Sequence, residues 1–90
     1  MYTTPATTLE HAIQRIFGRL CQEHDTNGPD SWVPRGELRA ELQIPVDLFR
    51  EAMSVLRPED GRHLQESAAG LRLGTSARVD CEAGRASFTL

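Results

Sequence analysis

The fold depends on the stretch WVPRGELRAELQIP, which occupies residues 32–45. Pro34 suits the first turn of a helix, because that turn leaves its N–H groups without helical partners and a proline has no N–H to offer. The residues behind it predict a helix of about eight residues that buries Leu38 and Leu42. Pro45 starts another helix after a gap of only about two or three residues. The stretch therefore predicts two short helices joined by a tight turn.

An apolar side recurs along the second of these helices at spacings of three and four residues, which is typical of a helix that packs on a core. Its members are Leu48, Phe49, Ala52, Val55 and Leu56. Arg57 precedes Pro58, and the residue before a proline is pushed out of the α conformation. The helix is therefore expected to end near Arg57 after about 12 residues.

The longest helix is expected before this pair. Residues 7–10, Thr-Thr-Leu-Glu, match a capping box, in which a threonine side chain accepts a backbone hydrogen bond and the glutamate reaches back. An apolar stripe then follows the helical spacing over about 17 residues. The stripe consists of Leu9, Ala12, Ile13, Ile16, Phe17, Leu20 and Cys21. Turn-forming residues at positions 25–30 end the helix.

Two short strands are expected after the third helix. Residues 63–65 and 71–73 are predicted as strands, with residues 67–70 as the loop of a β-hairpin. Beyond the hairpin, apolar and polar residues continue to alternate. The alternation predicts an extra strand or a second hairpin within residues 76–90.

These elements place the chain in the α+β class, as a three-helix bundle followed by a β-hairpin. Its 90 residues leave room for a single core. Residues 1–6 carry no periodicity and are predicted as a flexible tail, residues 7–75 as the domain, and residues 76–90 as a C-terminal extension.

The order of these elements resembles that of a winged helix, the form of the helix-turn-helix that ends in a β-hairpin. The likeness is carried by residues 32–45 and 48–56, and it covers about residues 8–75. The resemblance implies that the third helix is a recognition helix, that the loop 67–70 is the tip of the wing, and that the module binds DNA as a transcription regulator. An unrelated α+β domain with three helices and a hairpin is the alternative fold.

The charge balance weighs against strong nonspecific binding of nucleic acid. Thirteen acidic residues stand against ten arginines and no lysine, which gives a net charge of −3. Nonspecific affinity comes largely from phosphates that basic side chains neutralise. A local basic patch is compatible with this balance, and the use of arginine alone is attributed to a GC-rich genome.

No apolar run approaches the roughly 20 residues that cross a bilayer. Residues 1–5 lack the basic start and the apolar stretch of a secretory signal. The sequence therefore predicts a cytoplasmic protein without a membrane partner.

If the domain binds double-stranded DNA, the outer face of the third helix offers Arg50, Ser54 and Arg57 to the groove. Arginine and serine side chains donate hydrogen bonds to base edges. Arg62 and Arg72, from the hairpin region, are expected to contact backbone phosphates.

The same helix supports a competing hypothesis, a winged helix used for protein–protein contact. Val46 and Met53 are expected to point outward, and exposed apolar side chains suit a protein surface. Asp47 and Glu51 also offset the arginines of this face, which leaves it neutral. A homodimer is predicted as well, through the first helix or a sheet edge, because a short chain buries a small fraction of its surface.

Cys21 and Cys81 lie 60 positions apart, and neither stands in a zinc-ligand spacing. Both are expected to stay reduced as small buried hydrophobes, with a disulfide as the less favoured alternative. The three histidines, at positions 11, 24 and 63, are scattered, and no nucleophile–base order or phosphate-binding loop is present. The sequence therefore predicts no catalytic residues, no metal site and no cofactor.

Overall fold

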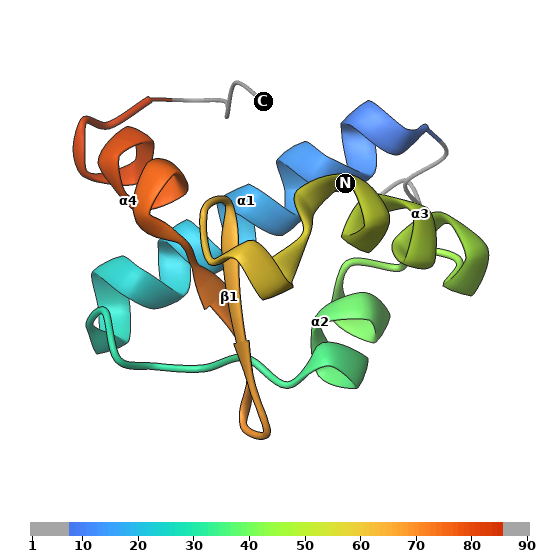
Figure 1. The fold of residues 1–90 in the computed structure, drawn as a ribbon, viewed down its shortest axis with the longest axis horizontal. Coiled ribbons are helices and arrows are strands. Elements are labelled where there is room, and N and C mark those ends of the chain that lie inside the picture. The colour runs from blue at the N-terminus through green and yellow to red at the C-terminus, as the bar shows by residue number, and fades with distance from the viewer. Residues whose placement is uncertain (1–7, 86–90) are drawn as a thin grey trace, which may run out of the picture.

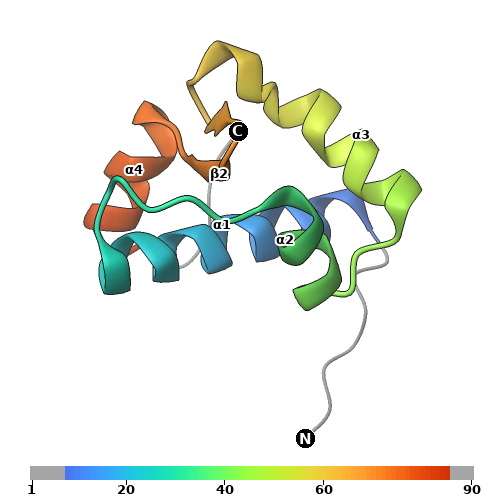
Figure 2. The ribbon, with the colours of Figure 1, turned by 90° about the horizontal axis from the view of Figure 1, so that it is seen from below.

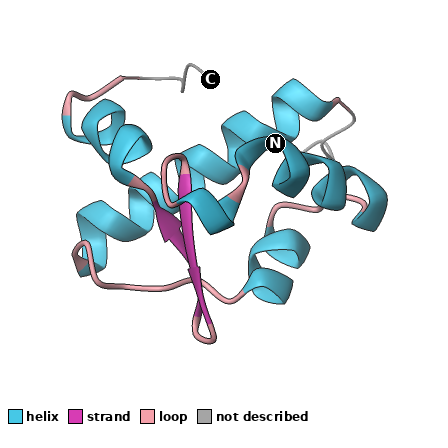
Figure 3. Ribbon diagram, viewed as in Figure 1, coloured by secondary structure: helices cyan, strands magenta, loops and turns pink. Residues whose placement is uncertain are grey.

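The computed structural model describes residues 8–85, which fold into four α-helices, a short 3-10 helix and one antiparallel hairpin (Figure 1 and Figure 3). In chain order these are α1 (Leu9–Asn27), α2 (Arg35–Glu41), α3 (Val46–Leu56), the 3-10 helix η1 (Pro58–Asp60), β1 (Leu64–Ser67), β2 (Gly70–Leu73) and α4 (Thr75–Glu82). The α+β class and the order of three helices before a hairpin are confirmed, and a fourth helix follows. None of the helices in this part of the chain has the length and apolar character needed to span a membrane.

α1 is the longest element, and α3, β2 and α4 pack against it (Figure 2). Its start is capped by Thr8, whose Oγ1 accepts a hydrogen bond from the His11 N–H at 3.1 Å, so the helix begins one residue later than the capping box predicts. Its apolar stripe is buried along most of its length, at Ala12, Ile13, Ile16, Phe17 and Leu20. Within residues 8–85, α1 therefore exposes no large apolar side chain of the kind that the predicted dimer contact requires.

The turn between α2 and α3 has the form that the two prolines predict. α2 starts directly after Pro34, and α3 starts directly after Pro45. Between them Gln43 adopts a left-handed conformation with φ 54°, and the Ile44 N–H donates to the Arg39 carbonyl at 3.1 Å. Ile44 is buried, so the turn is anchored in the core.

α3 buries most of the face expected, since Phe49, Ala52 and Leu56 lie in the core, but the face is shifted at two positions. Its buried side chains are Phe49, Ala52, Met53 and Leu56. Met53 is only 6% exposed, so the prediction that it points outward is wrong, and Val55, expected in the core, is 38% exposed. Both candidate faces obey the helical spacing. The packing of α3 against α1, which the spacing does not specify, selects between them.

The hairpin pairs β1 with β2 in an antiparallel register that sets Leu64 opposite Leu73. Val33 pairs with β2 as an isolated bridge, through backbone hydrogen bonds of 2.8 and 2.9 Å with Leu71. A glycine is required at this crossing, because Gly70 has φ +136° and a Cβ there would lie 2.2 Å from the Val33 carbonyl oxygen. The loop between the strands projects from the body of the molecule (Figure 1).

Residues 75–82 form α4, so the prediction of a strand or second hairpin over this segment is wrong. The loop before β1 supports the first turn of the helix. The Thr75 N–H donates to the Gly61 carbonyl at 3.2 Å, and the Ser76 N–H donates to the Arg62 carbonyl at 2.9 Å. These bonds satisfy N–H groups that a helix start leaves without partners, and they favour a helix over a strand.

The inner face of α4 carries Ala77 and Cys81, which are both buried. Residues four apart lie on one face of a helix and on one face of a strand, so the alternation did not distinguish the two. The rest of the expected strand, residues 86–90, lies outside the described residues.

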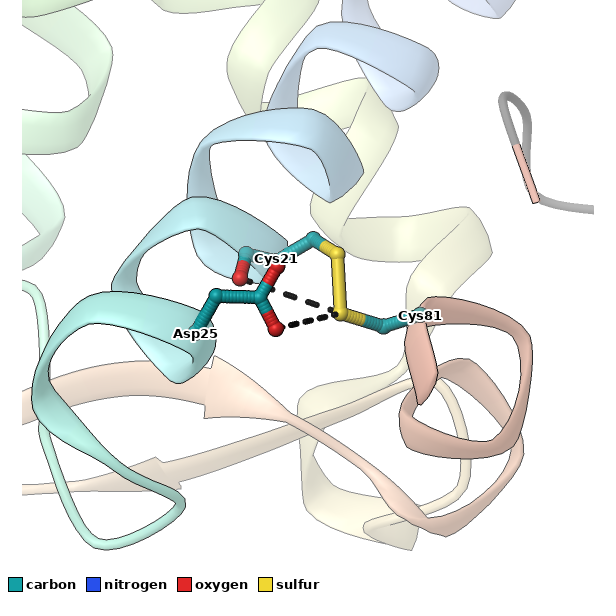
Figure 4. A group of neighbouring side chains, drawn as sticks. All are labelled: Cys21, Asp25 and Cys81. Atoms are coloured by element: carbon teal, nitrogen blue, oxygen red, sulfur yellow. Dashed lines mark hydrogen bonds between the residues drawn. A yellow bond between two sulfur atoms is a disulfide. The ribbon is translucent and has the colours of Figure 1, made fainter. Parts of the chain in front are cut away.

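A disulfide joins Cys81 to Cys21 of α1, with the two Cα atoms 5.6 Å apart (Figure 4). The prediction that both cysteines stay reduced is therefore wrong, and the less favoured alternative holds. The cause is the same misassigned segment, because α4 packs against α1 and brings the two cysteines together.

Candidate nucleic-acid interface

Some arginine side chains of this protein form hydrogen bonds or ion pairs within the fold, and others do not. Those that do include Arg19 with Glu23 and Glu41, Arg35 with Glu66, Arg39 with the Ile44 carbonyl, and Arg85 with Asp80. By contrast, no hydrogen bond or ion pair within residues 8–85 engages the guanidinium groups of Arg50, Arg57 and Arg62. These three exposed side chains lie on α3 or in the segment that follows it, where the sequence predicts contacts with DNA.

A shallow, open pocket lies between the end of α3 and the entrance to the hairpin. Its lining residues are Ser54, Val55, Arg57, Asp60, Arg62 and His63. The structure thus brings together three of the five residues predicted to contact DNA, although they come from different elements. Val55, Asp60 and His63 complete the pocket, and of these Val55 and Asp60 were not predicted to take part in binding.

The pocket owes its shape to the sharp turn after α3. Arg57 ends the helix in the left-handed conformation, with φ 47°, and its N–H donates to the Met53 carbonyl at 2.9 Å. Pro58 disfavours the α conformation at Arg57, and η1 then redirects the chain so that Arg57 and Arg62 line the same opening. Left-handed geometry is uncommon for a residue other than glycine and costs about 1 kcal/mol or more. The turn therefore holds one pocket residue in a conformation with an energetic cost.

The pocket carries a net positive charge at neutral pH. It sets the guanidinium groups of Arg57 and Arg62 against one carboxylate, that of Asp60. Burial lowers the pKa of the His63 imidazole below its usual 6.5, Arg62 lowers it further, and Asp60 opposes the change. His63 is therefore neutral at pH 7 and contributes hydrogen-bonding capacity rather than charge. Two guanidinium groups beside the Ser54 hydroxyl suit an anion such as a phosphate.

Arg72 lies away from the pocket, and its charge is engaged within the fold. Its guanidinium carbon lies 4.2 Å from the centroid of the Trp32 ring, and its Nε donates to Gln65 Oε1 at 2.8 Å. Its Nη1 also lies 3.4 Å from Asp30 Oδ1. An arginine held in this way stabilises the hairpin and has little freedom to reach a phosphate.

The outer face of α3 is mixed in character. Arg50 is exposed there beside the exposed carboxylates of Asp47 and Glu51. Val46 is 53% exposed, which confirms its predicted position, and Val55 adds a second exposed valine. These five side chains therefore combine one cation, two anions and two apolar groups, and Arg57 adds a second cation at the end of the helix.

Comparisons with known protein families, with curated proteins and with solved structures found no match to this chain. What the protein binds must therefore be inferred from the chemistry of its own residues.

Proposed function

We propose that this protein is a DNA-binding winged helix of the transcription-regulator type. In this proposal α3 enters the major groove, and the pocket formed by Ser54, Arg57 and Arg62 holds a backbone phosphate beside it. The observed order of elements supports the assignment, since Val33 forms an isolated bridge with β2 before α2 and the hairpin follows α3.

The proposal rests on one observation: Arg57 and Arg62 line the same pocket, and neither side chain forms an ion pair within residues 8–85. Desolvating an arginine that already has a carboxylate partner would require breaking that pair. The free guanidinium groups of this pocket avoid that cost. Arg50, which lies four residues before Ser54 on α3, is on the face that would approach base edges.

The test is binding to mixed-sequence duplex DNA by fluorescence anisotropy over a range of salt concentrations. Arg57→Asn removes the charge with a residue that tolerates the left-handed conformation, and Arg62→Gln removes the neighbouring charge. Each is expected to weaken binding to all sequences alike and to reduce the salt slope by about one. Arg50→Ala is expected to relax the preference at one base position.

Arg85→Gln serves as the matched control, because Arg85 lies beyond α4 and pairs with Asp80. It is expected to leave both affinity and salt slope unchanged. No detectable binding at the lowest salt concentration overturns the proposal, since release of counterions favours binding most strongly there.

The competing proposal, a winged helix that contacts another protein, has lost part of its support. Met53 is buried, so of the two residues predicted for that contact only Val46 remains exposed. Protein contact through α3 predicts that Val46→Ser weakens partner capture while Arg57→Asn and Arg62→Gln have no effect. The apolar stripe of α1 is also unavailable for the predicted homodimer contact, because it is buried within the chain.

A further inference from the structure

A second cluster of reactive side chains lies at the opposite end of α1 from Thr8. Sγ of Cys21, a carboxylate oxygen of Asp25 and Sγ of Cys81 all lie within 4.8 Å of one another (Figure 4). Cys21 and Asp25 are four residues apart and share one face of α1, while Cys81 reaches them from α4.

Among residues 8–85, the Asp25 carboxylate has no bonding partner in the oxidised protein. Its Oδ1 lies 3.9 Å from Cys81 Sγ, and the Cys21 carbonyl oxygen lies 3.7 Å from the same sulfur. A sulfur in a disulfide carries no proton, so neither contact is a hydrogen bond while the S–S bond is intact. No other hydrogen bond or ion pair engages the Asp25 carboxylate within the described part of the chain.

We propose that, when the disulfide is reduced, Cys21, Asp25 and Cys81 form a binding site for Zn²⁺. Zinc is bound by thiolates at about 2.3 Å and by carboxylate oxygens at about 2.0–2.2 Å, in tetrahedral geometry that places two sulfurs roughly 3.8 Å apart. The 5.6 Å between the two Cα atoms allows that separation by side-chain rotation alone. The 3.9 Å from Asp25 Oδ1 to Cys81 Sγ is already close to a ligand–ligand distance, and a water molecule completes the four ligands.

The chemistry balances with a dithiol reductant. The reductant gives two electrons and two protons, the S–S bond breaks, two S–H bonds form, and the reductant becomes a disulfide. Zn²⁺ then displaces both thiol protons as it binds. The anionic Asp25 disfavours free thiolates at this position, and the metal cation supplies the charge that stabilises them.

The ligands are expected to stay near one another after reduction, because α1 and α4 have further contacts. Ala77 of α4 is buried in the core, and His24 Nε2 lies 3.4 Å from Glu82 Oε1 beside the cluster. Neither contact depends on the S–S bond. The dithiol form therefore begins with its three ligands close together.

The experiment uses the full chain reduced with a phosphine, which leaves no competing thiol in solution, and Co²⁺ as the spectroscopic probe, followed by its displacement with Zn²⁺. We expect a thiolate-to-cobalt charge-transfer band and tetrahedral d–d bands in the reduced protein, and neither in the oxidised protein. Asp25→Asn is expected to weaken binding about tenfold or more. Asp47→Asn, the same change at an exposed site on α3, is the matched control and is expected to have no effect.

Absence of the charge-transfer band in the reduced protein overturns the proposal, as does equal binding by the oxidised protein or by Asp25→Asn. Circular dichroism covers the case in which reduction loosens the fold. If the reduced protein loses helical signal, Zn²⁺ must restore it, because metal binding and folding are then coupled. Failure to restore the signal counts against the site.

Discussion

The Arg72 guanidinium lies over the Trp32 ring, 4.2 Å from its centroid, and thereby ties β2 to the segment that leads into α2. Both side chains are partly exposed, yet each covers the other. Because of this pair, the guanidinium group of Arg72 is bound within the fold. The guanidinium group of Arg62, ten positions earlier, lines the pocket instead.

Arg72→Ala is expected to lower the free energy of unfolding by about 1–2 kcal/mol, because it removes the contact with Trp32 and the hydrogen bond to Gln65. Urea denaturation followed by Trp32 fluorescence measures the change. Arg62→Ala is the control, with an expected change within about 0.5 kcal/mol, because this exposed side chain forms no hydrogen bond or ion pair within residues 8–85. Equal losses from both variants contradict the structural role of Arg72.

Reduction of the disulfide is expected to cost about 4 kcal/mol of stability, from the loop entropy released when a link across 60 positions is opened. The measurement compares denaturation of oxidised and reduced protein with a metal chelator present. A Cys21→Ser/Cys81→Ser double variant should match the reduced protein. A double variant as stable as the oxidised protein contradicts this expectation.

Gly70→Ala is expected to destabilise the protein by several kcal/mol, because the added Cβ would collide with the Val33 carbonyl and the residue must keep a positive φ. Gly18→Ala is the matched control. Position 18 lies within α1 with open space around it, so alanine there is expected to stabilise the protein by roughly 0.5–1 kcal/mol. Thermal denaturation of the two variants shows shifts in opposite directions.

The lowered pKa of His63 predicts a pH dependence of stability. The unfolded chain binds a proton near the usual pKa of 6.5, whereas the folded chain binds it at lower pH. The stabilising contribution of neutral His63 is therefore fully present above the unfolded pKa and is lost as the pH falls through the folded pKa.

Denaturation at a series of pH values is expected to show this loss in the wild-type protein and a smaller one in His63→Gln. His11→Gln, at an exposed position on α1, is expected to retain the wild-type profile. Identical profiles for wild type and His63→Gln contradict the assignment.

The elements with strong local signals could be predicted from the sequence. α1 follows from a capped apolar stripe, and the turn between α2 and α3 follows from Pro34 and Pro45, because a proline fixes its own φ wherever it stands. These signals act over a few residues and need no knowledge of the rest of the chain.

The predictions that failed have a different origin. Each concerns a feature that contacts between residues distant in the sequence determine. Alternating small residues fit both a strand and a helix, and backbone bonds from the loop before β1 to Thr75 and Ser76 favour the helix. The packing of α3 against α1 buries Met53, which was expected at the surface, and exposes Val55, which was expected in the core. The disulfide depends on α4, so the sequence offered it only as the less favoured alternative.

The candidate site was predicted in part for the same reason. Arg57 and Arg62 were identified by type and by the resemblance to a winged helix. Their convergence depends on the left-handed turn at Arg57, and the engagement of Arg72 depends on Trp32, which lies 40 positions away in the chain.

The link between Cys21 and Cys81 encloses α2, α3 and the entire hairpin in one covalent ring. When a protease cleaves any single peptide bond inside that ring, the disulfide still joins the two fragments covalently. Such a nick separates the fragments on a gel only after reduction. The proposed DNA-binding surface thus lies within a closed covalent ring. A single cut in the backbone between α1 and α4 leaves both helices covalently attached to this surface.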